Sequence, residues 1–258
     1  MAKIITFITE KGGVGKSSCC FNISWELSKK KKILVIDMDG QRANITYFFG
    51  ADKGNGMMTM YDVLLKETPI KNVIISINPN LDLIRANNEV SNIPSTAKIS
   101  RFRNALNEVK NDYDYIFIDV NPTPTWTHAL VLSVSDFVLI PMLPDMASLE
   151  ANKGIAESII EVRDNMNSNL KVLGIVFNKY DARTNLSKAV TEASKEMAKL
   201  LNSKVFDNKI RNAVVLAENI YDHIGITDYA KKSQATIDVI KVCKEFEKEV
   251  DLWGKSFV

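Results

Sequence analysis

Short apolar runs, rich in β-branched and aromatic residues, recur along the chain and alternate with amphipathic stretches. Such short runs are typical of buried strands, and the stretches between them are typical of helices. The expected strands are Ile4–Ile8, Ile33–Ile36, Val73–Ile77, Leu81–Ile84, Tyr115–Ile118, Phe137–Ile140 and Val172–Phe177. The expected helices are Ser17–Lys30, Ile99–Val109, Ala147–Val162, Leu186–Leu201 and Ser233–Val250. This alternation predicts an α/β fold, with a mostly parallel twisted sheet covered by helices on both faces.

Composition adds limits without naming a function. The chain has 258 residues, 46% of them hydrophobic, which is enough for a large core. A net charge of +2 neither requires nor excludes a nucleic-acid partner. The segment 207–229 has no clear helical or strand pattern, and we see no repeat or linker.

The cysteines and the apolar runs indicate a cytoplasmic protein. The three cysteines, Cys19, Cys20 and Cys243, suit neither a disulfide framework nor a usual metal-binding spacing. We expect them to be small buried residues in a reducing compartment. The N-terminus lacks a signal-peptide pattern, and no apolar run approaches the roughly 18 residues that suggest a membrane span.

The stretch between the first expected strand and the first expected helix reads Lys-Gly-Gly-Val-Gly-Lys-Ser. Its glycines allow a tight turn with backbone N–H groups pointing inward, and Ser17 and Ser18 begin a helix whose positive end faces the same space. Lys16 can bind β- and γ-phosphates, and the Ser17 hydroxyl can ligate Mg²⁺. The expected nucleotide contacts are Lys11, Gly12, Gly13, Val14, Gly15, Lys16, Ser17 and Ser18.

This loop departs from the consensus G-x-x-x-x-G-K-[ST] at one end. Glu10 stands where the consensus has its first glycine, and an additional lysine, Lys11, follows it. A chance glycine-rich turn is a poor explanation, because strand, loop and helix occur in the order that a phosphate loop needs.

Carboxylates follow two of the expected strands. The second strand runs into Asp37 and Asp39, and the run Tyr115–Ile118 ends at Asp119. The carboxyl ends of parallel strands form the site in α/β proteins, and Mg²⁺ and an attacking water both need oxygen partners there. We therefore expect all three carboxylates near the phosphate loop.

A further polar segment, Asn178 to Asp181, follows the last expected strand. The Asn178 side chain can donate and accept hydrogen bonds at once, so it could read a purine edge. The same segment satisfies N-K-x-D, which in GTP-binding proteins reads guanine through the aspartate. The residues themselves leave the identity of the nucleotide open, and a polar turn is the alternative.

Taken together, these segments resemble the ParA family of deviant Walker-A partition ATPases, which includes MinD relatives. The family loop K-G-G-x-G-K-[ST] matches Lys11 to Ser17 in order. Five further stretches resemble family motifs: Val35–Gln41 (V-D-x-D-P-Q), Tyr113–Asp119 (Y-D-Y-I-I-I-D), Ile140–Glu150 (I-P-x-x-P-x-x-x-A-L-E), Tyr180–Thr184 (Y-D-x-R-T) and Val214–Glu218 (V-x-L-[SA]-E). The resemblance covers nearly the whole chain.

The resemblance implies a three-layer P-loop NTPase fold in which residues 1–258 form a single nucleotide-binding domain, with no N-terminal DNA-reading domain. It implies ATP and Mg²⁺ as cofactors and a weak ATPase activity that a ParB-like centromere-binding protein stimulates. The ATP-bound homodimer of such proteins binds DNA without sequence preference, which implies a nucleoid-associated protein that segregates a plasmid or a chromosome.

The resemblance also implies roles for individual residues. Lys11 would reach the partner subunit's phosphates, and Lys16 would hold the β- and γ-phosphates. Ser17 would ligate Mg²⁺, with Asp119 and Asp37 around the hydrated ion. Asp39 would position the attacking water. Lys11, Lys16 and Asp39 are thus the expected catalytic residues.

Two departures from the family pattern affect these expectations. Gly40 replaces the proline after Asp39, which we expect to make that loop more flexible. Near Ile210 the family commonly has a proline and arginines, whereas this chain has one basic residue there. The candidate DNA contacts are Arg183, Lys188, Arg211, Lys231 and Lys232. An ordinary surface charge is the alternative for each of them.

Three other functions fit parts of the sequence. A MinD-like membrane-cycling ATPase would need a basic amphipathic C-terminal helix, but Lys244 to Glu249 mixes both charges. A GTPase of related fold fits N-K-x-D but not the additional Lys11. A metabolic or metal-cluster enzyme on the same fold is disfavoured by the cysteine spacing.

Overall fold

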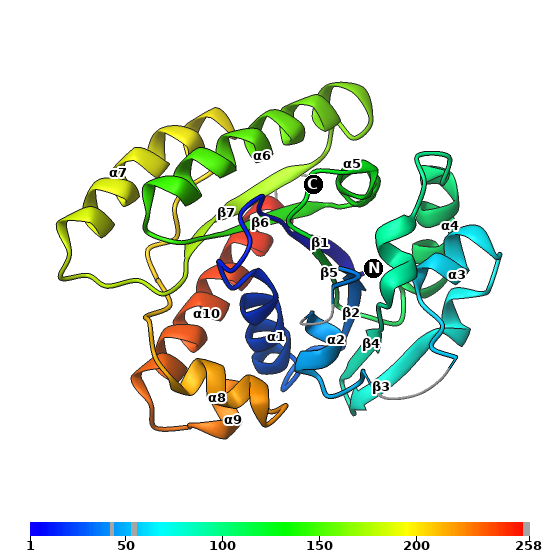
Figure 1. The fold of residues 1–258 in the computed structure, drawn as a ribbon, viewed down its shortest axis with the longest axis horizontal. Helices are drawn as coiled ribbons and strands as arrows, with labels where there is room; N and C mark the ends of the chain where they lie inside the picture. Colours follow the sequence, from blue (N-terminus) through cyan, green and yellow to red (C-terminus); the bar gives the residue numbers. More distant parts are fainter. Residues whose placement is uncertain (42–43, 53–55, 255–258) are drawn as a thin grey trace.

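A seven-stranded sheet lies between two layers of helices in the computed structural model, which describes residues 1–41, 44–52 and 56–254 (Figure 1). The strands are β1 (Lys3–Phe7), β2 (Ile33–Met38), β3 (Ile74–Asn78), β4 (Leu81–Ile84), β5 (Tyr115–Val120), β6 (Phe137–Met142) and β7 (Lys171–Phe177). Their order in the sheet is β3-β4-β2-β5-β1-β6-β7, and every pairing is parallel except that of β3 with β4. The predicted fold class is confirmed.

Helices cover both faces of this sheet. They are α1 (Lys16–Leu27), α2 (Ile45–Phe48), α3 (Met60–Leu65), α4 (Ile99–Val109), α5 (Trp126–Leu132), α6 (Met146–Asn165), α7 (Asn185–Leu200), α8 (Val215–Tyr221), α9 (Ile226–Tyr229) and α10 (Gln234–Gly254), with short 3-10 turns η1 (Ile70–Asn72) and η2 (Asn88–Asn92). Apolar residues of α1 and α10 pack on one face, and those of α3 to α7 pack on the other. None of the described helices is long and apolar enough to cross a membrane.

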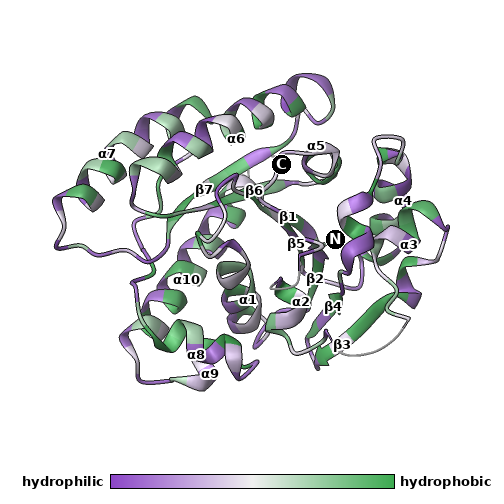
Figure 2. Cartoon of the chain, in the orientation of Figure 1, coloured by the Kyte–Doolittle hydropathy of each residue, from purple (hydrophilic) through white to green (hydrophobic). Residues whose placement is uncertain are grey.

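The two cores follow from the alternation of side chains along each strand. In β1, Ile4 belongs to the core under α4 to α7, whereas Ile5 and Phe7 belong to the core under α1 and α10. Strands β2, β5 and β6 are buried at every position, as expected for central strands covered on both faces. In Figure 2 the helices α6, α7 and α10 alternate between hydrophobic and hydrophilic residues, as amphipathic covering helices do.

The structure differs from the sequence prediction in short elements and in one strand direction. Helices α2, α3, α5, α8 and α9 were not predicted, because helices of four to seven residues are too short to show a helical period. The last two occupy the segment 207–229 that had no clear pattern. Strand β3 is antiparallel because only Pro79 and Asn80 separate it from β4, and so short a connection cannot form a parallel crossover.

The parallel strands bring the predicted site residues to one edge of the sheet. Phe7 of β1 is in register with Asp119 of β5, and Asp119 is in register with Asp37 of β2. The segments that leave β6 and β7 begin at the same edge and carry Asp145 and Asn178. The C-terminal ends of β2, β5, β6 and β7 therefore surround the loop that follows β1.

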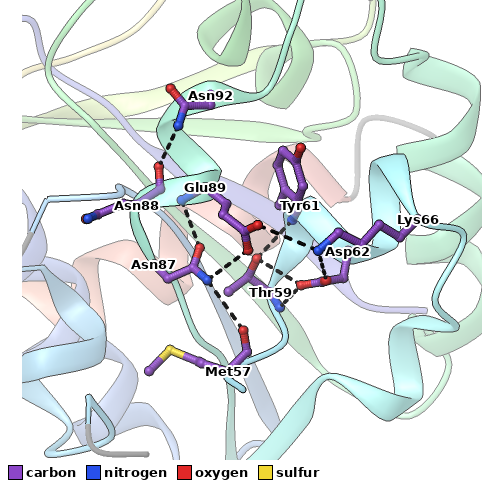
Figure 3. Close-up of polar contacts among 9 residues, drawn as sticks. All are labelled: Met57, Thr59, Tyr61, Asp62, Lys66, Asn87, Asn88, Glu89 and Asn92. Atoms are coloured by element: carbon purple, nitrogen blue, oxygen red, sulfur yellow. Dashed lines mark hydrogen bonds and ion pairs between the residues drawn. The ribbon is translucent and has the colours of Figure 1, made fainter. Parts of the chain in front are cut away.

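A polar network joins α3 to η2 beside the segment that leaves β2 (Figure 3). Thr59 and Asp62 form a capping box at the start of α3. The Lys66 ammonium bridges Asp62 at 3.0 Å and Glu89 at 3.6 Å, and the Asn87 side chain donates to Glu89 at 3.1 Å. This network fixes η2, the surface on which the loop after Asp39 packs.

Candidate nucleotide-binding site

The loop between β1 and α1 has the backbone of an anion cradle. Gly13 and Gly15 have φ values of 75° and 85°, in the left-handed region that favours glycine. A Cβ at Gly15 would also lie 2.0 Å from the Asn178 amide nitrogen, so only glycine fits. A Cβ at Gly12 or Gly13 would meet no atom of the described residues within 4 Å, which leaves open space above the loop. No side chain caps α1, so its first N–H groups remain available to a phosphate.

Lys16 and Asp119 form a buried ion pair at the base of this cradle. Their side chains are 6% and 0% exposed, and the Lys16 ammonium contacts Asp119 Oδ1 and lies 3.3 Å from the Ser17 hydroxyl. Burial raises the pKa of Asp119, and Lys16 opposes that rise by stabilising the carboxylate. The structure thus brings together three of the predicted residues.

The donor set beside this pair fits a magnesium ion. Asp119 Oδ2 is buried and has no hydrogen-bond partner among the described residues. An unpartnered carboxylate oxygen is costly in a protein interior, so this atom indicates a donor or cation that completes the site. Together with the Ser17 hydroxyl it offers the oxygen chemistry that a hydrated Mg²⁺ prefers.

Asp37 makes its contacts within the chain segment that follows β2. Its Oδ2 accepts from the Thr46 N–H at 2.9 Å and the Thr46 hydroxyl at 2.5 Å, and its Oδ1 accepts from the Asp39 N–H at 2.9 Å. These bonds attach α2 and Asp39 to the sheet. Burial and the nearby Asp119 raise the pKa of Asp37 to about 8. The place of Asp37 around Mg²⁺ stays a prediction.

Asp39 lies in a tightly packed loop. Its carboxylate accepts from the Gln41 N–H at 3.0 Å, and its backbone oxygen accepts from the Asn44 side chain at 2.6 Å. A Cβ on Gly40 would lie 2.1 Å from the Ser91 hydroxyl of η2. Close packing on η2 therefore favours glycine at this position, and the expected effect of Gly40 on the flexibility of the loop stays a prediction.

The raised pKa of Asp37 predicts how stability depends on pH. The folded protein holds this proton up to about pH 8, whereas an unfolded aspartate loses it near pH 4. The stabilisation is complete below the unfolded pKa and is lost as pH rises through 8, with a slope of up to ~1.4 kcal/mol per pH unit. Urea denaturation of the nucleotide-free protein should give a lower free energy of unfolding at pH 8 than at pH 6. Asp37→Asn should flatten that difference, and equal differences in both proteins would contradict the assignment.

Asn178 holds the phosphate loop in place. Its side-chain nitrogen donates to the Val14 carbonyl at 2.9 Å, and its side-chain oxygen accepts from the Lys179 N–H at 2.9 Å. Lys179 adopts a left-handed φ of 51° and donates from its ammonium to the Gly13 carbonyl at 3.2 Å. The predicted contact of Asn178 with a purine stays a prediction, since the structure shows its amide bonded to the loop.

The aspartate of the N-K-x-D pattern has a local partner. Asp181 accepts from Nε and Nη2 of Arg183 at 3.0 and 2.8 Å, and this pairing lowers its pKa to about 2. Guanine recognition through N-K-x-D needs a carboxylate that is free to accept from the base. The Asp181–Arg183 pair therefore disfavours the GTP interpretation.

The candidate DNA contacts fall into two groups. Arg183 pairs with Asp181, and the Arg211 guanidinium pairs with Asp238 at 2.5 and 2.9 Å. Both arginines line a cleft of about 700 Å³ together with these two carboxylates. The other three candidates are exposed, and none of them forms an ion pair within the described parts of the chain: Lys188, Lys231 and Lys232.

Two residues near the site were not predicted. His128 of α5 is buried with its Nε2 2.8 Å from the Asn121 carbonyl, and burial and Lys16 lower its pKa. Asp145 caps α6 by accepting from the Ser148 N–H at 2.7 Å, and both its oxygens accept from the Lys11 ammonium at 2.8 Å. The spacing Asp-x-x-Ser is a helix N-cap pattern, so the cap could have been recognised, but its pairing with Lys11 could not.

A glycine loop that leads into a helix, with a buried lysine–aspartate pair beneath it, defines a P-loop nucleotide-binding protein. A family model described as an AAA domain matches residues 2–172. The sporulation initiation inhibitor protein Soj of Bacillus subtilis is 32% identical over 95% of this chain and 98% of its own. The chain belongs to the ParA/MinD family of P-loop ATPases, with the Soj and ParA partition proteins.

Solved structures agree with this family. A plasmid partition protein from Borrelia burgdorferi superposes with a TM-score of 0.75 at 25% identity, over 96% of this chain and 99% of its own. An ATP complex of a Cyanothece McdA variant has a TM-score of 0.85 at 19% identity, over 97% of this chain and 96% of its own. At that identity the McdA likeness supports the fold alone.

Proposed function

We propose that this chain is a DNA partition ATPase that acts as a single nucleotide-binding domain. ATP with Mg²⁺ converts it to a homodimer, the dimer binds DNA without sequence preference, and a ParB-like partner stimulates hydrolysis. The observation that carries the proposal is the position of Lys11, the additional lysine of the loop. Lys11 lies at the rim with a half-buried ammonium, where a facing subunit can meet it, in a chain whose relatives are partition proteins.

The residues of the site divide the work of phosphoryl transfer. The N–H groups of the loop and of α1 bind phosphate oxygens, and Lys16 exchanges Asp119 for the β- and γ-phosphates. Ser17 and Asp119 would hold the magnesium ion, which neutralises charge on the phosphates. Asp39, held by its neighbours Gln41 and Asn44, orients the attacking water.

Lys11 supplies the step that depends on a second subunit. A cation inserted at a dimer seam offsets the triphosphate charge only when two subunits face each other. Hydrolysis removes part of that charge, so it weakens the dimer. The site thus couples dimerisation to whether the bound nucleotide is ATP or its hydrolysis product.

Phosphate release from ATP and from GTP, with and without Mg²⁺, tests this function. We expect slow ATP hydrolysis that requires Mg²⁺ and rises in the presence of DNA and the partner protein. Hydrolysis of GTP without hydrolysis of ATP would overturn the proposal and would favour the N-K-x-D interpretation.

The pairing of the arginines predicts which basic residues matter for DNA. Charge reversal at Lys231 and Lys232 should weaken retention on non-specific duplex DNA in ATP, because both lysines are exposed and neither forms an ion pair within the part of the chain that the structure describes. Each lost phosphate contact should reduce the slope of log affinity against log salt by about 0.9. Arg183→Ala is the matched control and should have a smaller effect, since Arg183 already pairs with Asp181. A larger effect of Arg183→Ala would place the DNA at the cleft instead.

The membrane-cycling alternative has little support at the C-terminal helix. The exposed face of α10 carries Lys244, Lys248 and Asp251, so both signs of charge remain on it. Trp253 is half-buried, and the Lys171 ammonium lies 5.4 Å from its ring centre, so this ring is not a free anchor. Co-sedimentation with anionic vesicles in ATP should show no binding, and ATP-dependent binding would revive the alternative.

A further inference from the structure

Lys11 is not free in the monomer. Its ammonium lies 2.8 Å from both carboxylate oxygens of Asp145, the residue that caps α6 of the same chain. The two side chains are 28% and 35% exposed, so the pair is only half shielded from water. This two-pronged contact holds the ammonium against its own subunit.

The two residues that precede Lys11, Thr9 and Glu10, also contact α6. The Thr9 hydroxyl donates to the Asn152 side chain at 3.1 Å, and the Lys11 N–H donates to Thr9 at 3.4 Å. A Cβ on Gly154 would lie 2.4 Å from the Glu10 carboxylate, so Glu10 lies directly on α6 at that residue. Thr9 and Lys11 are thus hydrogen-bonded to Asn152 and Asp145, and Glu10 between them packs on the helix at Gly154.

We propose that Asp145 is a counter-ion within the subunit that holds Lys11 back from a partner subunit and so sets how readily the ATP dimer forms. This inference rests on the proposed function, because Lys11 must leave Asp145 to reach the partner's phosphates. The Lys11 ammonium cannot pair fully with both the Asp145 carboxylate and the partner's triphosphate. Dimerisation therefore has to displace the pair with Asp145.

Competition of this kind has a predictable size. A partly exposed ion pair changes an equilibrium by about threefold. A symmetric dimer breaks two such pairs, so the effects multiply to about tenfold in the dissociation constant. The pair is weak enough for a triphosphate to displace and strong enough to suppress dimers at low protein concentration.

Asp145→Asn tests this inference without removing the helix cap. Asparagine caps helices as well as aspartate does, so the bond from the Ser148 N–H survives while the charge is lost. Glu150→Gln is the matched control, since it removes a carboxylate of α6 that pairs with Lys153 rather than with Lys11. Sedimentation velocity with ATP and Mg²⁺ gives the dissociation constant of each protein. Amine labelling of Lys11 without nucleotide reports whether its ammonium is freed.

We expect Asp145→Asn to tighten the ATP dimer by about tenfold and to speed Lys11 labelling by about threefold, with Glu150→Gln unchanged in both. A dimer that Asp145→Asn leaves unchanged or weakens overturns this inference alone, as does unchanged labelling. A wild-type protein that stays monomeric in ATP overturns the proposed function, and this inference with it.

Discussion

Lys11→Ala should leave ATP binding nearly intact and abolish the ATP-dependent dimer. The Lys11 ammonium contacts Asp145 of its own subunit, so we expect its loss to remove no ligand from the phosphate cradle of that subunit. At the dimer seam its ammonium would meet a desolvated triphosphate. Loss of such a charge pair costs about 2–5 kcal/mol, and a symmetric dimer contains two, so we expect the dissociation constant of the ATP dimer to rise by at least about 1,000-fold.

The measurement is the molar mass in solution of the wild-type protein and of Lys11→Ala in saturating ATP and Mg²⁺. The affinity of each protein for ATP is measured separately. Lys71→Ala is the control, because it removes a lysine of η1 that pairs with Asp112. Equal dimerisation of wild type and Lys11→Ala would contradict the role of Lys11. Loss of ATP affinity in Lys11→Ala would show that it acts within its own subunit.

Lys16→Ala should lose nucleotide binding and also destabilise the nucleotide-free fold. The buried ammonium is the main cation at the base of the cradle, and we expect ATP affinity to fall by about 100-fold. Its removal leaves the fully buried Asp119 without its cation, and breaking a buried pair on one side costs about 3–5 kcal/mol. Isothermal titration and urea unfolding measure the two effects separately.

A double variant separates binding from stability. Lys16→Met with Asp119→Val replaces both buried partners by apolar groups, which is often neutral for stability. We expect it to recover most of the free energy of unfolding and none of the ATP affinity. A double variant as unstable as Lys16→Ala would show that the pair is not the source of the destabilisation.

The fold was largely predictable because its information is local. The central strands are mostly apolar runs, and α4, α7 and α10 carry a clear 3.6-residue period. What could not be predicted depends on contacts between distant segments. The direction of β3 depends on its pairing with β4, and the requirement for glycine at Gly40 depends on Ser91 of η2, 51 positions further along the chain.

The candidate site was predictable in its members but not in its pairings. Spacing and residue type identified Lys16, Ser17 and Asp119, which the structure brings together. The partners of Lys11, Asn178 and the two arginines could not be predicted, because a charged or amide side chain can reach several groups and only the folded chain selects one. Those pairings changed the interpretation most. They show Lys11 restrained by its own subunit and Asn178 bracing the loop.

The central claim is that ATP turns this protein into a dimer through the two lysines of one loop. Sedimentation velocity of the wild-type protein without nucleotide, with ADP, with GTP and with ATP, each with Mg²⁺, tests it most directly. We predict monomers in the first three conditions and a dimer with ATP. A dimer in all four conditions, or a monomer in ATP, would contradict the account.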